Sequence, residues 1–218
     1  MTRLQKSIFS AIAMAAIACV SPQALAHSKH EVSAHAQALS KTTQTELTLR
    51  DLWLDHAFWV RAVVLETLRA NKAGAAAAET AAVNNAQLLA KSMEPFYGKP
   101  ASEKVFALLA GHYGAVKQYL LATKAKSATD QEAARKAMFD NAEQIAVFLS
   151  TANPHLPVDT LRAMLLAHGG HHVLQIQQLD GQNYAQEAQT WEAMKGHMYG
   201  IADALTFALV KQFPAQFE

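Results

Sequence analysis

The sequence predicts an all-α fold, a closed six-helix bundle built of three helical hairpins with a 56-residue internal repeat. Two observations lead to this prediction. Helix breakers are sparse, with nine glycines and six prolines in 218 residues, and apolar residues recur at helical spacing while no segment alternates like a strand. In addition, polar and apolar residues recur at a fixed interval of 56 residues, which indicates three copies of one helix pair.

Residues 1–26 have the features of a secretory signal peptide. Arg3 and Lys6 precede an apolar run over residues 8–20, and a small-x-small triplet ending at Ala26 follows. This order predicts cleavage after Ala26, and the apolar run is too short to span a bilayer permanently. We therefore expect an exported protein without an integral membrane segment, periplasmic in a Gram-negative cell and otherwise secreted.

The charge and the cysteine content exclude several classes of function. Cleavage removes Arg3 and Lys6, so that 17 basic residues face 18 acidic ones, a net charge of −1. A near-neutral chain without a run of basic residues lacks the positive charge that binds the phosphates of nucleic acid. Nucleic acid is therefore excluded as a partner. The only cysteine, Cys19, leaves with the signal, so the mature chain has no disulfide or thiolate site. Lipidation of Cys19 is the alternative processing, although leucine rather than Ala16 is usual three residues before a lipidated cysteine.

A flexible polar segment over residues 27–45 precedes a single helical-bundle domain over residues 46–218. Turn residues divide this domain, with breaks at Gly74, between Pro95 and Pro100, at Ser127, at Asn153-Pro154 and at Gly181. Thr129 and Glu132 have the spacing of a capping box that starts the fourth helix. The predicted helices cover residues 46–71, 76–94, 101–126, 129–150, 158–180 and 184–212.

The repeat places one polar residue on every predicted helix. His56, His112 and His168 are 56 residues apart on the first helices of the hairpins, and Asn85, Asn141 and His197 have the same spacing on the second helices. The apolar positions keep this register, as in the sets Leu49/Val105/Leu161, Leu52/Leu108/Met164 and Leu89/Ile145/Ile201.

These repeated polar residues are predicted to face the bundle interior. His56 lies on one helical stripe with Leu52, Trp59 and Val63. A buried polar group needs a partner, because leaving it unsatisfied in a low-dielectric interior is costly. The sequence therefore predicts that a common ligand or a hydrogen-bond network joins the six residues.

A transition metal is the ligand that this residue set favours. Neutral imidazole binds zinc, copper and iron, and three histidines on one axis, with His197 as a fourth, would form a nitrogen site. Asn85 and Asn141 would then orient the imidazole rings. No hydrolase, phosphate-loop or metallopeptidase motif is present. We therefore favour sequestration, buffering or delivery of the metal, while the sequence names no protein partner.

Two other readings of the core remain open. One is a structural or interaction bundle whose buried His and Asn side chains satisfy one another without any metal. The other is a metal-dependent enzyme with an open ligand position.

Further histidines allow weaker predictions. His172 lies one turn beyond His168, while Met138 and Met194 precede Asn141 and His197 by three residues. His172, Met138 and Met194 could form a second site suited to Cu(I), or the methionines could simply fill the core. Three more histidines lie near the new N-terminus, namely His27, His30 and His35. They could chelate a metal, or they could have no such role.

Several motifs resemble a poorly characterised family of small all-helical bacterial proteins, known mostly from spore-forming Gram-positive bacteria. The resemblance extends from about Leu52 to Pro214, and it implies an all-helical fold and a role for His56, His112, Asn141, His168 and His197. The family carries inconsistent automatic enzyme labels, and no motif in this sequence supports them. The chain departs from the family at His171-His172. The motifs are Leu52-Trp53-x-x-His56-x-x-Trp59-x-Arg61, Pro95-Phe96-Tyr97-Gly98, Asn141-Ala142-x-x-Ile145-Ala146-x-Phe148-Leu149, Asn153-Pro154, Met164-Leu165-x-x-His168 and Lys211-Gln212-Phe213-Pro214.

Overall fold

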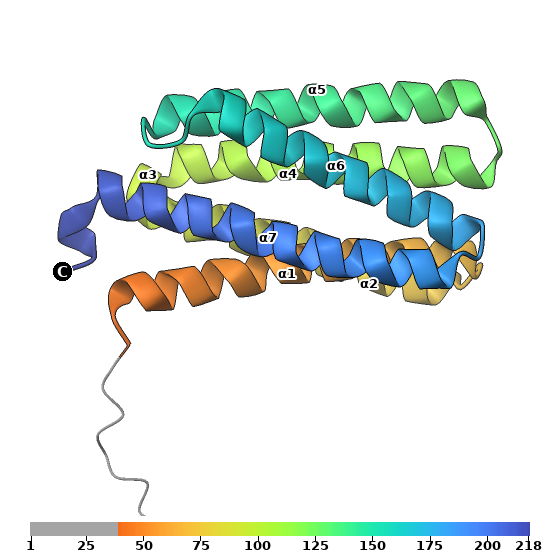
Figure 1. The fold of residues 1–218 in the computed structure, drawn as a ribbon, viewed down its shortest axis with the longest axis horizontal. Helices are drawn as coiled ribbons and strands as arrows, with labels where there is room; N and C mark the ends of the chain where they lie inside the picture. Colours follow the sequence, from red (N-terminus) through yellow and green to blue (C-terminus); the bar gives the residue numbers. More distant parts are fainter. Residues whose placement is uncertain (1–38) are drawn as a thin grey trace, which may run out of the picture. The chain divides into compact units, whose positions relative to one another are not determined.

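The computed structural model describes residues 39–218, and this part of the chain is helical without any strand (Figure 1). The predicted all-α fold is confirmed. The predicted signal peptide, Cys19 and the N-terminal histidines lie outside the described residues. None of the helices in the described part is both long and apolar enough to cross a membrane. The six long helices are α1 (Lys41–Leu68), α2 (Lys72–Ser92), α4 (Lys99–Lys124), α5 (Ala128–Ala152), α6 (Val158–Asp180) and α7 (Tyr184–Gln212), joined by the short α3 (Glu94–Tyr97) and followed by the 3-10 turn η1 (Pro214–Gln216).

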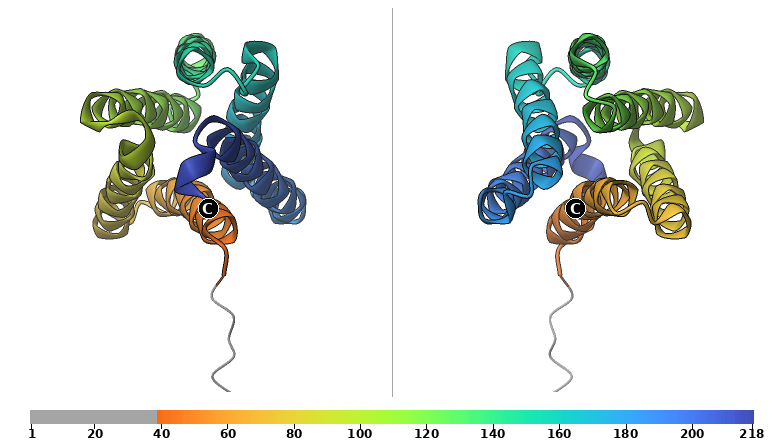
Figure 2. Two further views of the ribbon diagram at one scale, coloured as in Figure 1. Left: turned by 90° about the vertical axis from the view of Figure 1, so that its left-hand side faces the viewer. Right: turned by 90° about the vertical axis from the view of Figure 1, so that its right-hand side faces the viewer.

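The six long helices close into a ring. Each packs against the next in chain order, and α7 returns to pack against α1. Seen end-on, the helices surround a common axis (Figure 2). The first helices of the three hairpins, α1, α4 and α6, also contact one another across this axis. The predicted closed bundle is confirmed, and residues on α1, α4 and α6 can therefore meet at its centre.

Two arginine–carboxylate pairs hold the seam between the first and last long helices. Arg50 donates two hydrogen bonds to Asp203, at 2.7 and 2.8 Å. Arg61 donates two to the buried Glu187, at 2.6 and 2.7 Å. Paired donors of this kind fix geometry as well as charge. They set how α7 lies along α1.

The three hairpins turn in the same way. The second residue after each first helix has a left-handed backbone with φ of 57°, at Ala70, Lys126 and Gln182. The N–H that follows each one donates to a carbonyl five residues earlier, which closes the first helix with a Schellman-type bond. These turns recur every 56 residues. The fourth long helix is capped by Ser127, whose side chain accepts from the N–H of Asp130, and not by the predicted Thr129.

The repeated residues of the second helices bind the main chain of the first helices. The three acceptor carbonyls lie four residues before His56, His112 and His168, on the turn of helix that carries each histidine. In each hairpin, one such hydrogen bond thus joins the two helices beside the histidine. The hydrogen bonds run from Asn85 Nδ2 to Leu52 O at 2.9 Å, from Asn141 Nδ2 to Leu108 O at 3.1 Å and from His197 Nε2 to Met164 O at 2.8 Å.

The apolar core consists of two clusters. One contains Trp53, Leu109 and Leu165, which lie three residues before the repeated histidines. The other contains Val60 and Val116, which lie four residues after the first two of them. The histidines on α1, α4 and α6 therefore lie between two apolar layers.

The hydrogen bond of His197 gives a prediction about stability. Replacing His197 with Asn, the residue at the equivalent position of the other two hairpins, should retain the bond to Met164 O and change the free energy of unfolding by less than about 0.5 kcal/mol. His197→Ala should lose about 1–3 kcal/mol, because a partly buried hydrogen bond and ring packing disappear. Urea unfolding with chelator present measures both. An Asn variant as unstable as the Ala variant would contradict a hydrogen-bonding role.

Candidate metal centre

Four histidine side chains from three helices meet on the bundle axis. His56 of α1, His112 of α4 and His168 of α6 have ring centroids 5.2 to 6.0 Å apart. His172, one turn further along α6, lies 4.4 Å from His168 by the same measure. All four side chains are buried, with exposed fractions of 1 to 4%. His56, His112 and His168, which the repeat predicts to converge, do so.

The four rings present nitrogens at metal-binding separation. One ring nitrogen from each lies within 4.8 Å of the other three. A tetrahedral metal with bonds of 2.0–2.1 Å to imidazole holds its nitrogens about 3.3 Å apart. The Nε2 atoms of His168 and His172 are 3.1 Å apart, close to this spacing, whereas the other separations reach up to 4.8 Å.

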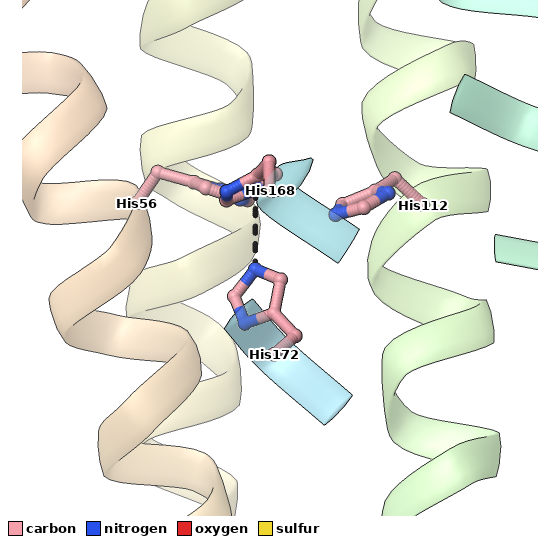
Figure 3. Close-up of side chains that lie close together, drawn as sticks. All are labelled: His56, His112, His168 and His172. Atoms are coloured by element: carbon pink, nitrogen blue, oxygen red, sulfur yellow. Dashed lines mark hydrogen bonds between the residues drawn. The ribbon is translucent and has the colours of Figure 1, made fainter. Parts of the chain in front are cut away.

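The cluster has two distinct sides. Figure 3 shows His56, His112 and His168 at about one level, with His172 to one side of them. Four residues along α6 place His172 about 6 Å towards the C-terminal end of that helix. On the other side lies the apolar layer of Trp53, Leu109 and Leu165. His172 occupies the repeat position that Val60 and Val116 hold in the other hairpins.

Four of the eight ring nitrogens in the cluster are buried without a hydrogen-bond partner. His56 Nε2, His168 Nδ1 and both nitrogens of His112 are unpaired, whereas the Nε2 atoms of His168 and His172 share one hydrogen bond. Buried polar side-chain atoms in folded proteins nearly always have a partner. The cluster is therefore not a satisfied hydrogen-bond network in itself.

Burial keeps these imidazoles neutral. It lowers the pKa of His56 to about 3, with a smaller contribution from His112, and it lowers the pKa of His112 to about 4. The pKa values of His168 and His172 are well below 6.5, first because of burial and then because of the neighbouring histidines. A neutral ring offers the lone pair that a metal needs.

The fourth histidine of the cluster differs from the predicted one. His197 is not part of the group of four, because its Nε2 atom donates to Met164 O, and its ring centroid is 6.4 Å from that of His168. His172 is the fourth member of the group instead. The available signal was a break in the repeat, since a polar residue at 172 stands where the other two hairpins have valine.

The other predicted site residues are placed as follows. Asn85 and Asn141 bind helix carbonyls through their amide nitrogens, and their Oδ1 atoms have no partner. They thus bind the backbone of the helices that carry the histidines. The sequence predicted instead that they would orient the imidazole rings. Met138 and Met194 are fully buried in different apolar clusters, and His172 joins the three repeated histidines.

Comparison with known proteins adds no relative. No protein-family model, curated protein or solved structure matches this chain significantly.

The buried histidines predict that the metal-free protein loses stability in mild acid. Each folded-state pKa lies below the unfolded value near 6.5, so the unfolded chain takes up protons that the native state excludes, and stability falls as the pH drops below about 6.5. Each histidine should cost about 1.4 kcal/mol per pH unit. Together the four should cost about 5 kcal/mol at about pH 5.5, which is near the whole stability of some domains.

Urea unfolding in chelator at about pH 7.5, 6.5 and 5.5 measures this slope. His172→Val places the residue of the equivalent positions at 172 and should reduce the slope by about a quarter. Equal stability of the wild type at all three pH values would show that the native cluster accepts protons, contrary to the prediction.

Proposed function

We propose that the protein binds one transition metal ion through His56, His112, His168 and His172, and that it sequesters, buffers or delivers this ion. The observation that carries the proposal is a group of four ring nitrogens from buried histidines within 4.8 Å of one another, in a cluster with four buried ring nitrogens that lack a hydrogen-bond partner. A metal ion would give these lone pairs a partner. Metal coordination would then offset the desolvation of the imidazoles.

The four imidazole donors limit which metal ions the site can bind. The four histidines form the group without any carboxylate or thiolate in it. Imidazole suits zinc, copper and iron, whereas calcium and magnesium require oxygen ligands. The buried Glu187 on α7 is held by Arg61 and also accepts a hydrogen bond from Gln175 at 3.2 Å. That carboxylate thus has partners of its own.

The competing reading as a metal-free structural bundle has less support. It requires the buried His and Asn side chains to satisfy one another, yet the four histidines share a single hydrogen bond. The Oδ1 atoms of Asn85 and Asn141 also lack partners. Within residues 39–218, the polar core is thus incomplete without a further group.

We also propose that the protein acts outside the cytoplasm. This part of the proposal rests on the sequence of residues 1–26, in which a basic start, an apolar run and a small-x-small triplet follow one another. The mature chain would then begin at His27 and meet its metal after export.

Replacing His112 with Leu separates metal binding from folding. Because both His112 nitrogens are buried and unpaired, an apolar side chain of similar size should raise the stability of the metal-free protein by about 1–2 kcal/mol. The same change should lower metal affinity at least about 100-fold and abolish the stabilisation that bound metal gives.

The test uses the untagged chain from His27 onwards. Mass spectrometry gives its metal content, and thermal unfolding of wild type and His112→Leu is compared in chelator and with added zinc, copper or iron. His155→Ala, at an exposed histidine outside the cluster, is the control and should retain metal binding. A metal-induced rise in Tm of equal size in wild type and His112→Leu would defeat the proposed site.

A further inference from the structure

An apolar cavity lies against the layer of His56, His112 and His168, on the side opposite His172. Its walls include these three rings, and it provides about 10 Å³ of space for the centre of a water molecule. The remaining lining residues lie one turn before the histidines or on α5. They are Trp53, Leu109, Leu165, Ala142 and Ile145.

Two further cavities share lining residues with this one or with each other. Trp53, Leu109 and Ile145 also line a second cavity, with about 30 Å³ of space for the centre of a water molecule. The second cavity shares Met93, Val105, Leu149 and other residues with a third, of about 20 Å³ by the same measure. The third extends to Tyr97 and Asn153, next to α3. Three small spaces with shared lining residues thus lie between α3 and the histidine cluster.

The walls determine what these spaces can hold. Aliphatic and aromatic side chains form most of them, so that apolar occupants are favoured. Charged molecules are excluded by the cost of desolvation. One donor is available beside the histidines, because Trp53 is 6% exposed and its Nε1–H has no hydrogen-bond partner. The spaces therefore suit a small uncharged molecule that can accept one hydrogen bond.

The arrangement of the histidines leaves one side of a bound metal open. His56, His112 and His168 would surround the ion, and His172 would approach it from one side (Figure 3). The opposite side faces the cavity, which His172 does not line. Metals held by four nitrogen ligands can take a fifth ligand at such a position.

We infer that a metal in this site binds a small uncharged diatomic molecule of the dioxygen or nitric oxide class on its cavity side. This inference rests on the proposed metal binding. The molecule reaches the metal through the apolar spaces, and Trp53 Nε1–H donates a hydrogen bond to it. Metal binding alone explains neither the cavity series nor the unpaired indole N–H.

The test uses nitric oxide as the probe and the Fe(II)-loaded protein. Iron content is measured before the gas is added, and electron paramagnetic resonance then detects the iron–nitrosyl adduct. Ala142→Met inserts the residue that the third hairpin carries at the equivalent position, Met198, and fills the cavity beside the histidines. It should retain the iron and lower the affinity for nitric oxide about tenfold or more.

Ala86→Met is the matched control. Ala86 occupies the same repeat position in the first hairpin and is buried, but it lines none of the three cavities. It should retain both the iron and the adduct. Trp53→Phe should retain the adduct and shift its N–O stretching frequency, because the donated hydrogen bond is lost.

The outcomes separate the inference from the function on which it rests. A protein that takes up no iron or other metal ion defeats the proposed function, and the inference with it. An iron-loaded wild type that forms no adduct, or an Ala142→Met variant with wild-type affinity, overturns the inference alone. An unchanged N–O frequency in Trp53→Phe overturns the assigned hydrogen bond. Xenon binding to the metal-free wild type, followed by nuclear magnetic resonance, tests the cavity itself; absence of binding counts against the inference.

Discussion

Four neutral imidazole rings buried without enough hydrogen-bond partners are the constraint on which the rest of this structure depends. Each ring has lost its contacts with water, and only His168 and His172 have gained one with each other. The lowered pKa values of His56 and His112 reflect the same desolvation. A bundle of this size must therefore gain enough from its two apolar clusters to keep the rings in place, and coordination of an ion would reverse part of that cost.

The backbone supports the cluster through one local arrangement used in all three hairpins. A left-handed residue ends the first helix, and a side chain from the second helix binds the turn of the first that carries the histidine. Three rings thereby reach the axis at similar heights. His172 departs from this symmetry, because Val60 and Val116 occupy the equivalent positions. The departure gives the cluster two unlike sides, one with a fourth nitrogen and one with an apolar space.

The helices, their closure and the meeting of His56, His112 and His168 could be predicted, because a fixed period constrains both the helical register and the position of each residue along the axis. The identity of the fourth nitrogen could not. Equivalent sequence positions show which residues lie at the same level along the bundle axis. They do not show how close to the axis each side chain comes. The ring of His197 stops at a carbonyl of the neighbouring helix. The start of α1 at Lys41, before the predicted residue 46, reflects a local cap in which Ser40 accepts from the N–H of Thr43.

The four clustered histidines come from α1, α4 and α6, so they belong to all three hairpins. A chain that is still being synthesised, or that crosses a membrane unfolded, has no such group of nitrogens until its last hairpin packs against its first. An ion bound by the cluster would then be selected where the polypeptide folds and not where it is made. For such a protein, the metal supply of the compartment of folding would decide which ion is captured, even where the ligands themselves discriminate weakly between metals.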